Sequence, residues 1–172
     1  MPKARKYTGN KDPHPKTRPG TKRFQDYMVF LFGMKNLGIY ANRKVNGSGK
    51  ANPPMSVHST GRACDLGGTP DQVKAAIDFL YAFRDADHLD VEEIHDYRNV
   101  WIAGNGFGAG YRCDRDNGGV FSGWRVYTKN TIGAGGNWVH YEVAPALADN
   151  PAKVDAAFKK VMDKIAAAMS AK

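Results

Sequence analysis

Hydrophobic positions recur at helical spacing in three segments of the chain. Each segment repeats apolar side chains at three- and four-residue steps, which is typical of a helix with one face on a core. The second segment begins with Thr69 before a proline, and the third begins with Asn150 before a proline; both pairs are helix-start signals. The pattern predicts helices over Phe24–Lys35, from Thr69 to near Asp87, and from Pro151 to about Met169.

Short segments rich in Val, Ile, Trp and Tyr, bounded by Gly, Asn or Asp, predict strands between these helices. Gly104–Ser122 is predicted to be a long loop, either a lid on the substrate side or a surface insertion. Several strands in succession indicate an α+β fold, in which helices pack on one face of an antiparallel sheet. The predicted strands are Gly38–Arg43, Leu89–Tyr97, Asn99–Ala103, Gly123–Thr128 and Trp138–Val143.

Length and composition change this picture little. A chain of 172 residues with 42% hydrophobic and 24% charged side chains fits one domain with an ordinary core. No apolar run approaches the roughly 20 residues that cross a bilayer, so we expect no membrane insertion. The N-terminus lacks the apolar stretch of a secretory signal peptide, which favours synthesis in the cytoplasm. Cys64 and Cys113 are expected to be buried thiols.

Positive charge is concentrated at the N-terminus. Residues 1–25 contribute +7 of the formal net charge of +8. We therefore divide the chain into a basic, proline-rich, mobile arm over residues 1–23 and a folded domain over residues 24–172. Such an arm favours loose adhesion to anionic polymers, including those of a bacterial wall. Nucleic acid is not expected to be its main partner, because no recognised nucleic-acid-binding signature follows it.

Two segments carry metal-binding chemistry. The first, Ser56-Val-His-Ser-Thr-Gly-Arg-Ala-Cys-Asp65, places an imidazole and a carboxylate seven residues apart across a turn of small residues. The second, Asn137-Trp-Val-His-Tyr-Glu142, places another imidazole on a short strand. Two neutral histidines and one carboxylate suffice for a tetrahedral zinc site whose fourth position stays open, as catalytic zinc sites require.

The patterns S-x-H-x-x-G-R-A-x-D and W-V-H resemble those of the LAS-type zinc peptidases, over about Gly38 to Val143. That family includes D-Ala-D-Ala carboxypeptidases, L-Ala-D-Glu endopeptidases of phage lysins and the hedgehog amino-terminal domain. The resemblance implies a hedgehog/DD-peptidase-like fold, with Zn²⁺ on His58, Asp65 and His140. It also implies a zinc metallopeptidase that hydrolyses a bond in the stem peptides of bacterial peptidoglycan.

The resemblance also suggests residues that meet the substrate. Arg43, upstream of the first motif, would steady the developing oxyanion or bind a substrate carboxylate; its alternative is a solvated arginine at a strand end. Ser56 is expected to hydrogen-bond the loop beside the substrate. Trp138, with Trp101 and Trp124, would wall a peptide groove unless these rings serve core packing.

One position departs from the family pattern. Many relatives carry the carboxylate that accepts a proton from water three residues before the last histidine, where this chain has Asn137. Our candidates for this catalytic role are His95 or Asp96, followed by Glu93, all on one predicted strand. Glu142, on the face of His140, is an alternative partner that fixes the imidazole tautomer. If no group reaches the water, the domain is a non-catalytic, zinc-stabilised structural or binding module of a phage particle.

A wall-degrading fold without a signal peptide resembles a phage endolysin or a virion-associated lysin. We therefore expect a protein made in the host cytoplasm that acts at the bacterial cell wall. It would arrive there by release on lysis or as part of a virion.

Overall fold

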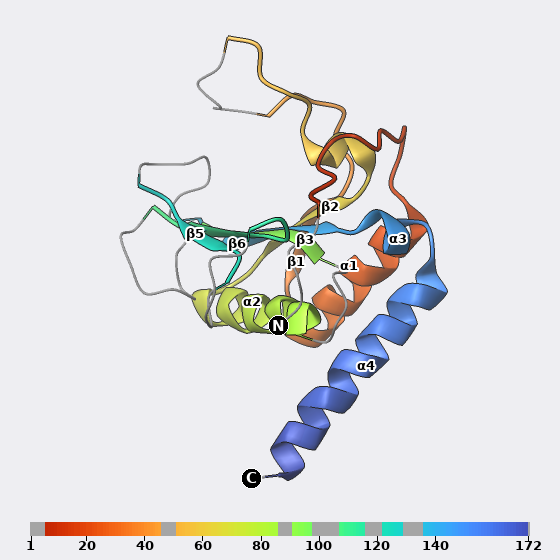
Figure 1. The fold of residues 1–172 in the computed structure, drawn as a ribbon, viewed down its shortest axis with the longest axis vertical. Helices are drawn as coiled ribbons and strands as arrows, with labels where there is room; N and C mark the ends of the chain where they lie inside the picture. Colours follow the sequence, from red (N-terminus) through yellow and green to blue (C-terminus); the bar gives the residue numbers. More distant parts are fainter. Residues whose placement is uncertain are drawn as a thin grey trace.

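The protein, described here from a computed structural model, has an α+β fold built on one six-stranded antiparallel sheet (Figure 1). The structure describes residues 6–45, 51–85, 91–97, 107–115, 122–128 and 136–171. The strands are β1 (Lys35–Gly38), β2 (Ala63–Gly67), β3 (Val91–Asp96), β4 (Ala109–Arg112), β5 (Trp124–Val126) and β6 (Trp138–Val143). The helices are α1 (Pro19–Phe32), α2 (Pro70–Asp85), α3 (Pro145–Ala148), α4 (Pro151–Ser170) and the 3-10 turn η1 (Val57–Thr60).

The sheet order is β1-β2-β6-β3-β4-β5, so the last strand of the chain lies at the centre, between β2 and β3. This order brings the first motif, on η1 and β2, beside the second motif on β6. In register, Asp65 of β2 lies opposite His140 of β6, and His140 lies opposite His95 of β3. Three residues that are distant in the sequence therefore form one row across three strands.

Helices cover one face of the sheet. Figure 1 shows α1 and α2 beneath the strands, with α4 alongside α1 and projecting beyond it. Phe24 of α1 is fully buried and its ring packs on Phe83, Tyr141 and Phe158. The helix starts follow the predicted chemistry: Thr69 accepts a hydrogen bond from the backbone N–H of Gln72, and Asn150 accepts one from Lys153.

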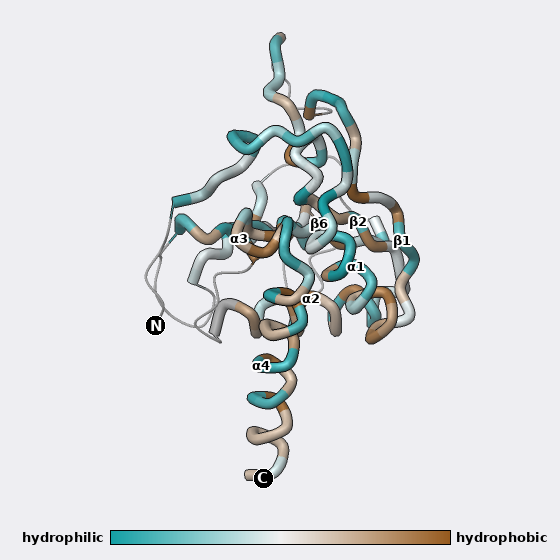
Figure 2. The backbone as a smooth tube through the Cα atoms, turned by 90° about the vertical axis from the view of Figure 1, so that its right-hand side faces the viewer, coloured by the Kyte–Doolittle hydropathy of each residue, from teal (hydrophilic) through white to brown (hydrophobic). Residues whose placement is uncertain are grey.

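The opposite face carries Asp65, His140 and His95, and we call it the metal face. In the described part of the chain, the segments that cover it contain no helix longer than η1. Figure 2 draws these segments mainly in hydrophilic and neutral colours. The sheet therefore separates an apolar helical layer from a polar layer. Within the described residues, no helix is long and apolar enough to cross a membrane.

Several element boundaries differ from the sequence predictions. Helix α1 begins at Pro19 rather than Phe24, because the proline occupies a first-turn position where no backbone N–H is needed. Strand β4 lies within the predicted loop Gly104–Ser122, where its glycine-rich sequence hides any strand alternation. The first strand covers Lys35–Gly38 instead of Gly38–Arg43. The predicted strand Asn99–Ala103 lies outside the described residues.

The structure also differs from the expected mobile arm. Residues 6–18, here called the N-terminal segment, lie across the metal face. Arg18 is buried, and its guanidinium binds the carboxylates of Asp12 and Asp149. Residues 19–23 belong to α1. Positive charge at this end therefore serves partly to attach the segment to the domain, which composition alone does not reveal.

Candidate metal centre

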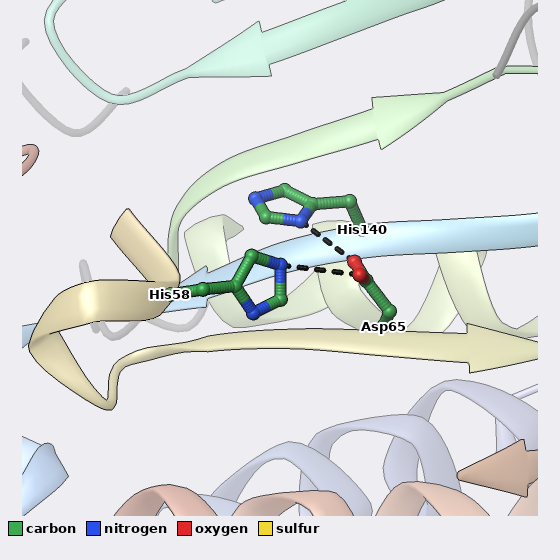
Figure 3. A group of neighbouring side chains, drawn as sticks. All are labelled: His58, Asp65 and His140. Carbon is green, nitrogen blue, oxygen red and sulfur yellow. Dashed lines mark hydrogen bonds and ion pairs between the residues drawn. The ribbon is translucent and has the colours of Figure 1, made fainter. Parts of the chain in front are cut away.

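His58, Asp65 and His140 come together at one point on the metal face (Figure 3). One possible ligand atom from each residue lies within 4.8 Å of the other two. Asp65 sits between the imidazoles, with Oδ2 3.1 Å from Nε2 of His58 and Oδ1 2.8 Å from Nδ1 of His140. The three residues of the sequence prediction are thus neighbours, although 75 positions separate Asp65 from His140.

Local structure aims His58 at this point. Ser56 caps η1 by accepting a hydrogen bond from the backbone N–H of His58 at 3.3 Å. The Nδ1 atom of His58 lies 2.6 Å from the carbonyl oxygen of Ile39, which accepts its proton and leaves Nε2 free to bind a metal. Ser56 is buried, as a capping residue should be, and it also lines the pocket.

The glycine and arginine of the first motif build the turn between η1 and β2. Gly61 has a φ of 67°, and a Cβ at this position would collide with the carbonyl oxygen of Lys16. Arg62 is fully buried, donates to the carboxylate of Glu92 at 3.0 Å and to the carbonyl of Val143 at 2.7 Å, and also donates to the carbonyl of Gly9. Arg62 therefore links the turn to β3, to β6 and to Gly9 near the N-terminus.

His140 is held from both sides. Its Nδ1 faces Asp65, and its Nε2 lies 3.4 Å from Oε1 of Glu142. Burial lowers the pKa of His140, but its hydrogen bonds to the two carboxylates outweigh burial and raise the pKa to about 10. Burial likewise raises the pKa of Asp65, but the two imidazoles lower it well below the ordinary value. Without a metal, His140 therefore lies between two carboxyl groups that favour the protonated form of its imidazole.

These donors fit a zinc ion. Tetrahedral zinc with bonds of about 2.1 Å places its ligand atoms about 3.4 Å apart. The Asp65 oxygens lie slightly closer than this to the two imidazoles, at 3.1 and 2.8 Å, and all three donors lie within 4.8 Å of one another. Two imidazole nitrogens and a carboxylate form the donor set of catalytic zinc sites, and Ile39 and Glu142 supply the outer partners that orient such imidazoles. The described residues supply three donors, which leaves one tetrahedral position open.

His95 of β3 is a direct neighbour of this group. Its ring centroid lies 5.3 Å from that of His140. Tyr127 Oη lies 2.5 Å from Nδ1 of His95, and Glu93 Oε2 lies 3.5 Å from Nε2. Burial raises the pKa of Glu93, but attraction by His95 outweighs it and lowers that pKa to about 2. His95 thus lies between a hydroxyl and a carboxylate, beside the metal group.

The structure does not place Asp96, one of the predicted catalytic residues, at the pocket over the metal group. Side chains alternate along β3, so Asp96 points to the face opposite His95. It pairs in register with Val139, whose side chain is part of the core, and it is itself fully buried. A bulge between Val91 and Glu93 shifts the alternation of β3, which puts Val91 on the helical face and both Glu93 and His95 on the metal face.

A pocket of about 400 Å³ opens over the metal group. Arg43 lines this pocket with an exposed side chain. Its carbonyl oxygen accepts a hydrogen bond from the backbone N–H of Ser56. Trp138 forms another wall, where its ring lies 4.2 Å from that of Tyr97. Trp124 is a core residue beneath the sheet, whereas Trp101 lies outside the described residues.

Asn137 gives no substitute for the missing carboxylate. Its side chain is exposed just before β6, its carbonyl accepts the backbone N–H of Gly68 at 3.0 Å, and it does not line the pocket. The carboxylates that do line the pocket with Asp65 are Glu93 and Glu142. Both lie on the metal face, directly opposite one another in the register of β3 and β6.

Sequence reasoning missed Tyr7 and Tyr127. Tyr7 Oη lies 2.7 Å from Oε2 of Glu142 and 3.0 Å from Oε2 of Glu93, and burial raises the pKa of this hydroxyl far above its ordinary value. Tyr7 lies more than 80 positions from either glutamate, so no local spacing connects them. A tyrosine within an otherwise basic, aromatic-poor segment is the one signal that the sequence offers.

Comparison with protein-family models, curated proteins and solved structures returned no match for this chain. The likeness to zinc peptidases therefore depends on the two motifs and on the geometry of the residues that they contain.

Proposed function

We propose that this protein is a zinc-dependent peptidase of the hedgehog/DD-peptidase type that cuts a bond in the stem peptides of bacterial peptidoglycan. The observation that carries the proposal is the convergence of His58, Asp65 and His140 within 4.8 Å at a pocket. The open coordination position and the orienting partners of both imidazoles support catalytic rather than purely structural metal binding.

A bound zinc ion would supply a Lewis acid for the scissile carbonyl and for the attacking water. His58, Asp65 and His140 would hold it, and Asp65 would bring the negative charge that offsets part of the charge of the ion. His58 is fixed by the Ile39 carbonyl and His140 by Glu142, so both rings keep the orientation that the metal requires.

His95 is the group that we assign to proton transfer. It lines the pocket beside His140, where it takes a proton from the attacking water and returns it to the leaving amine. Glu93, 3.5 Å from Nε2, stabilises the imidazolium that forms in between, and Tyr127 holds the other ring nitrogen. This assignment replaces the carboxylate that relatives carry at the position of Asn137.

Arg43 and Trp138 are the proposed substrate contacts. Arg43 stands at the rim with an exposed side chain, where it can meet a peptide carboxylate or the developing oxyanion. Trp138 and Tyr97 form an aromatic wall on the other side. The chemistry of these walls suits a short peptide that carries a free carboxylate, such as a stem peptide.

The test combines metal analysis with product identification. The purified full chain should contain about one zinc per molecule. Incubated with purified peptidoglycan, it should release new amino groups, and mass spectrometry of the fragments would identify the bond. A chelator should abolish the release, and added zinc should restore it.

His140→Ala is the loss-of-metal variant, and His14→Ala is its control, because His14 lies outside the metal group. Hydrolysis that survives both chelation and His140→Ala would contradict the proposal. Zinc bound at full occupancy with no cleavage of peptidoglycan would instead support the alternative, a zinc-stabilised structural or binding module of a phage particle, which the absence of a carboxylate at position 137 favours.

A further inference from the structure

The N-terminal segment is built into the wall of the metal pocket. Tyr7, Gly9 and Asn10 line the pocket. Neighbouring contacts attach the segment along its length: Thr8 Oγ1 donates to Glu92 at 2.8 Å, and Asn10 Nδ2 donates to the carbonyl of Met55 at 3.0 Å. A segment that served only to adhere to a wall polymer would not need side chains placed at this depth.

Tyr7 makes the contacts that reach furthest into the centre. Its hydroxyl lies between Glu142 and Glu93, at 2.7 and 3.0 Å. Each carboxylate in turn faces one imidazole: Glu142 lies 3.4 Å from Nε2 of His140, and Glu93 lies 3.5 Å from Nε2 of His95. A single hydroxyl therefore contacts both groups that orient the two neighbouring histidines.

The Tyr7 hydroxyl lies between two carboxylates that repel one another. Glu93 and Glu142 are direct cross-strand neighbours; Glu142 is buried and the Glu93 side chain is only 12% exposed, and two carboxylates at such positions repel one another. The Tyr7 hydroxyl offers them a common hydrogen-bond donor, which keeps them in place. Its ring is itself held by the guanidinium of Arg112, 4.8 Å from the ring centroid. Removal of the hydroxyl leaves the carboxylates free to turn apart.

We propose that Tyr7 is a positioning residue of the metal centre: its hydroxyl holds Glu142 against Nε2 of His140 and thereby keeps Nδ1 of that ring directed at Asp65 and the metal. This inference rests on the proposed zinc site. It makes the N-terminal segment part of the catalytic apparatus rather than a separate adhesion arm.

Tyr7→Phe tests the proposal in the full chain, because it keeps the ring and its contact with Arg112 and removes only the hydroxyl. Groups that hydrogen-bond a metal ligand typically contribute 10- to 100-fold to metal affinity. Tyr7 acts through such a group, Glu142, so we expect zinc binding to weaken by about tenfold, the lower end of that range. The melting temperature of the metal-free protein should change little. Tyr27→Phe is the matched control: its hydroxyl also binds a carboxylate, that of Asp155 at 2.8 Å, but between α1 and α4.

A double-mutant cycle separates positioning from a general structural effect. If Tyr7 acts through Glu142, Tyr7→Phe should cost zinc affinity in the wild-type background and almost none in a Glu142→Ala background. Equal losses in both backgrounds, or wild-type affinity in Tyr7→Phe, would overturn the inference. Failure of the wild-type chain itself to bind zinc in the same titration would instead overturn the proposed function.

Discussion

Asp65 and His140 lie directly opposite one another on neighbouring antiparallel strands, with Oδ1 of one 2.8 Å from Nδ1 of the other. The hydrogen-bonding register of β2 and β6 thus sets the distance between two ligands of the candidate metal centre. A rigid sheet is well suited to this task, because ligand positions on strands vary less than positions on loops.

Asp65→Asn tests the ligand role of the carboxylate. The amide has nearly the same shape but lacks the negative charge, so we expect zinc affinity to fall by more than about 100-fold. Asp71→Asn, an exposed change in the first turn of α2, is the control and should bind zinc as the wild type does. Metal analysis after dialysis against a weak chelator provides the measurement. Full zinc occupancy in Asp65→Asn would remove Asp65 from the site.

His95→Gln tests the assignment of proton transfer. Because a positioned acid–base group contributes about 10²- to 10⁴-fold to rate, we expect kcat to fall by that factor while zinc content stays unchanged. Asp96→Asn changes the next residue on the same strand, which faces the helices, and should keep zinc and most of the rate. Steady-state hydrolysis of a muropeptide measures both. The assignment fails if Asp96→Asn is the slower enzyme.

Gly61→Ala should destabilise the fold by several kcal/mol. The left-handed backbone costs a β-carbon about 1–2 kcal/mol, and here the new methyl also meets the carbonyl of Lys16. Gly33→Ala is the matched control, since Gly33 has a similar φ of 60° but meets only the side chain of Gln72, at 3.4 Å. Urea unfolding of both variants measures the difference. Equal losses would show that the Lys16 carbonyl moves aside without cost.

Zinc binding should strengthen as the pH rises. In the metal-free protein the pKa of His140 is raised to about 10, so near neutral pH zinc must displace at least one proton. The apparent affinity should therefore rise about tenfold per pH unit between pH 6 and 8. Competition with a chromophoric chelator measures this slope. A pH-independent affinity would mean that the ligands are already deprotonated.

The same shift affects the stability of the metal-free protein with the opposite sign. A raised folded-state pKa for His140 stabilises the fold below its ordinary pKa of 6.5, and this contribution is lost as the pH rises through about 10. Thermal unfolding in the presence of a chelator, repeated across this pH range, would measure the loss of stability. Saturating zinc should largely cancel this loss between about pH 7 and 8, because the zinc affinity rises with pH by the same one-proton dependence.

Arg62→Ala should cost about 3–5 kcal/mol, because it leaves the buried carboxylate of Glu92 without its charged partner. Arg23→Ala, which removes an exposed ion pair with Asp155, should change stability little. Chemical denaturation with both variants gives the comparison. A small loss for Arg62→Ala would mean that the other partners of Glu92, Thr8 among them, are sufficient to stabilise its carboxylate.

Local patterns along the chain predicted the helices and the identity of the candidate ligands. Apolar side chains at helical spacing and the caps Thr69 and Asn150 are local signals, and the structure confirms the helices that they predict. The spacing of His58 and Asp65 is local too, since one turn connects them. The α+β class followed from the order of these elements.

Tertiary structure alone decided which other groups join the site. The pleat and the bulge of β3 assign His95 and Glu93 to the metal face and Asp96 to the core, and a shift of one residue would reverse that choice. The position of Tyr7 depends on contacts across more than 80 residues. Strand β4 is defined by its pairing with β3 and β5, which no alternation in its own sequence indicates. Charge and proline content predict a mobile N-terminal segment, but partners distant in the sequence, the exposed Asp149 and the buried Glu142, hold it in place. Composition does not specify which distant residues become neighbours on folding. These partners could therefore be identified only in the tertiary structure.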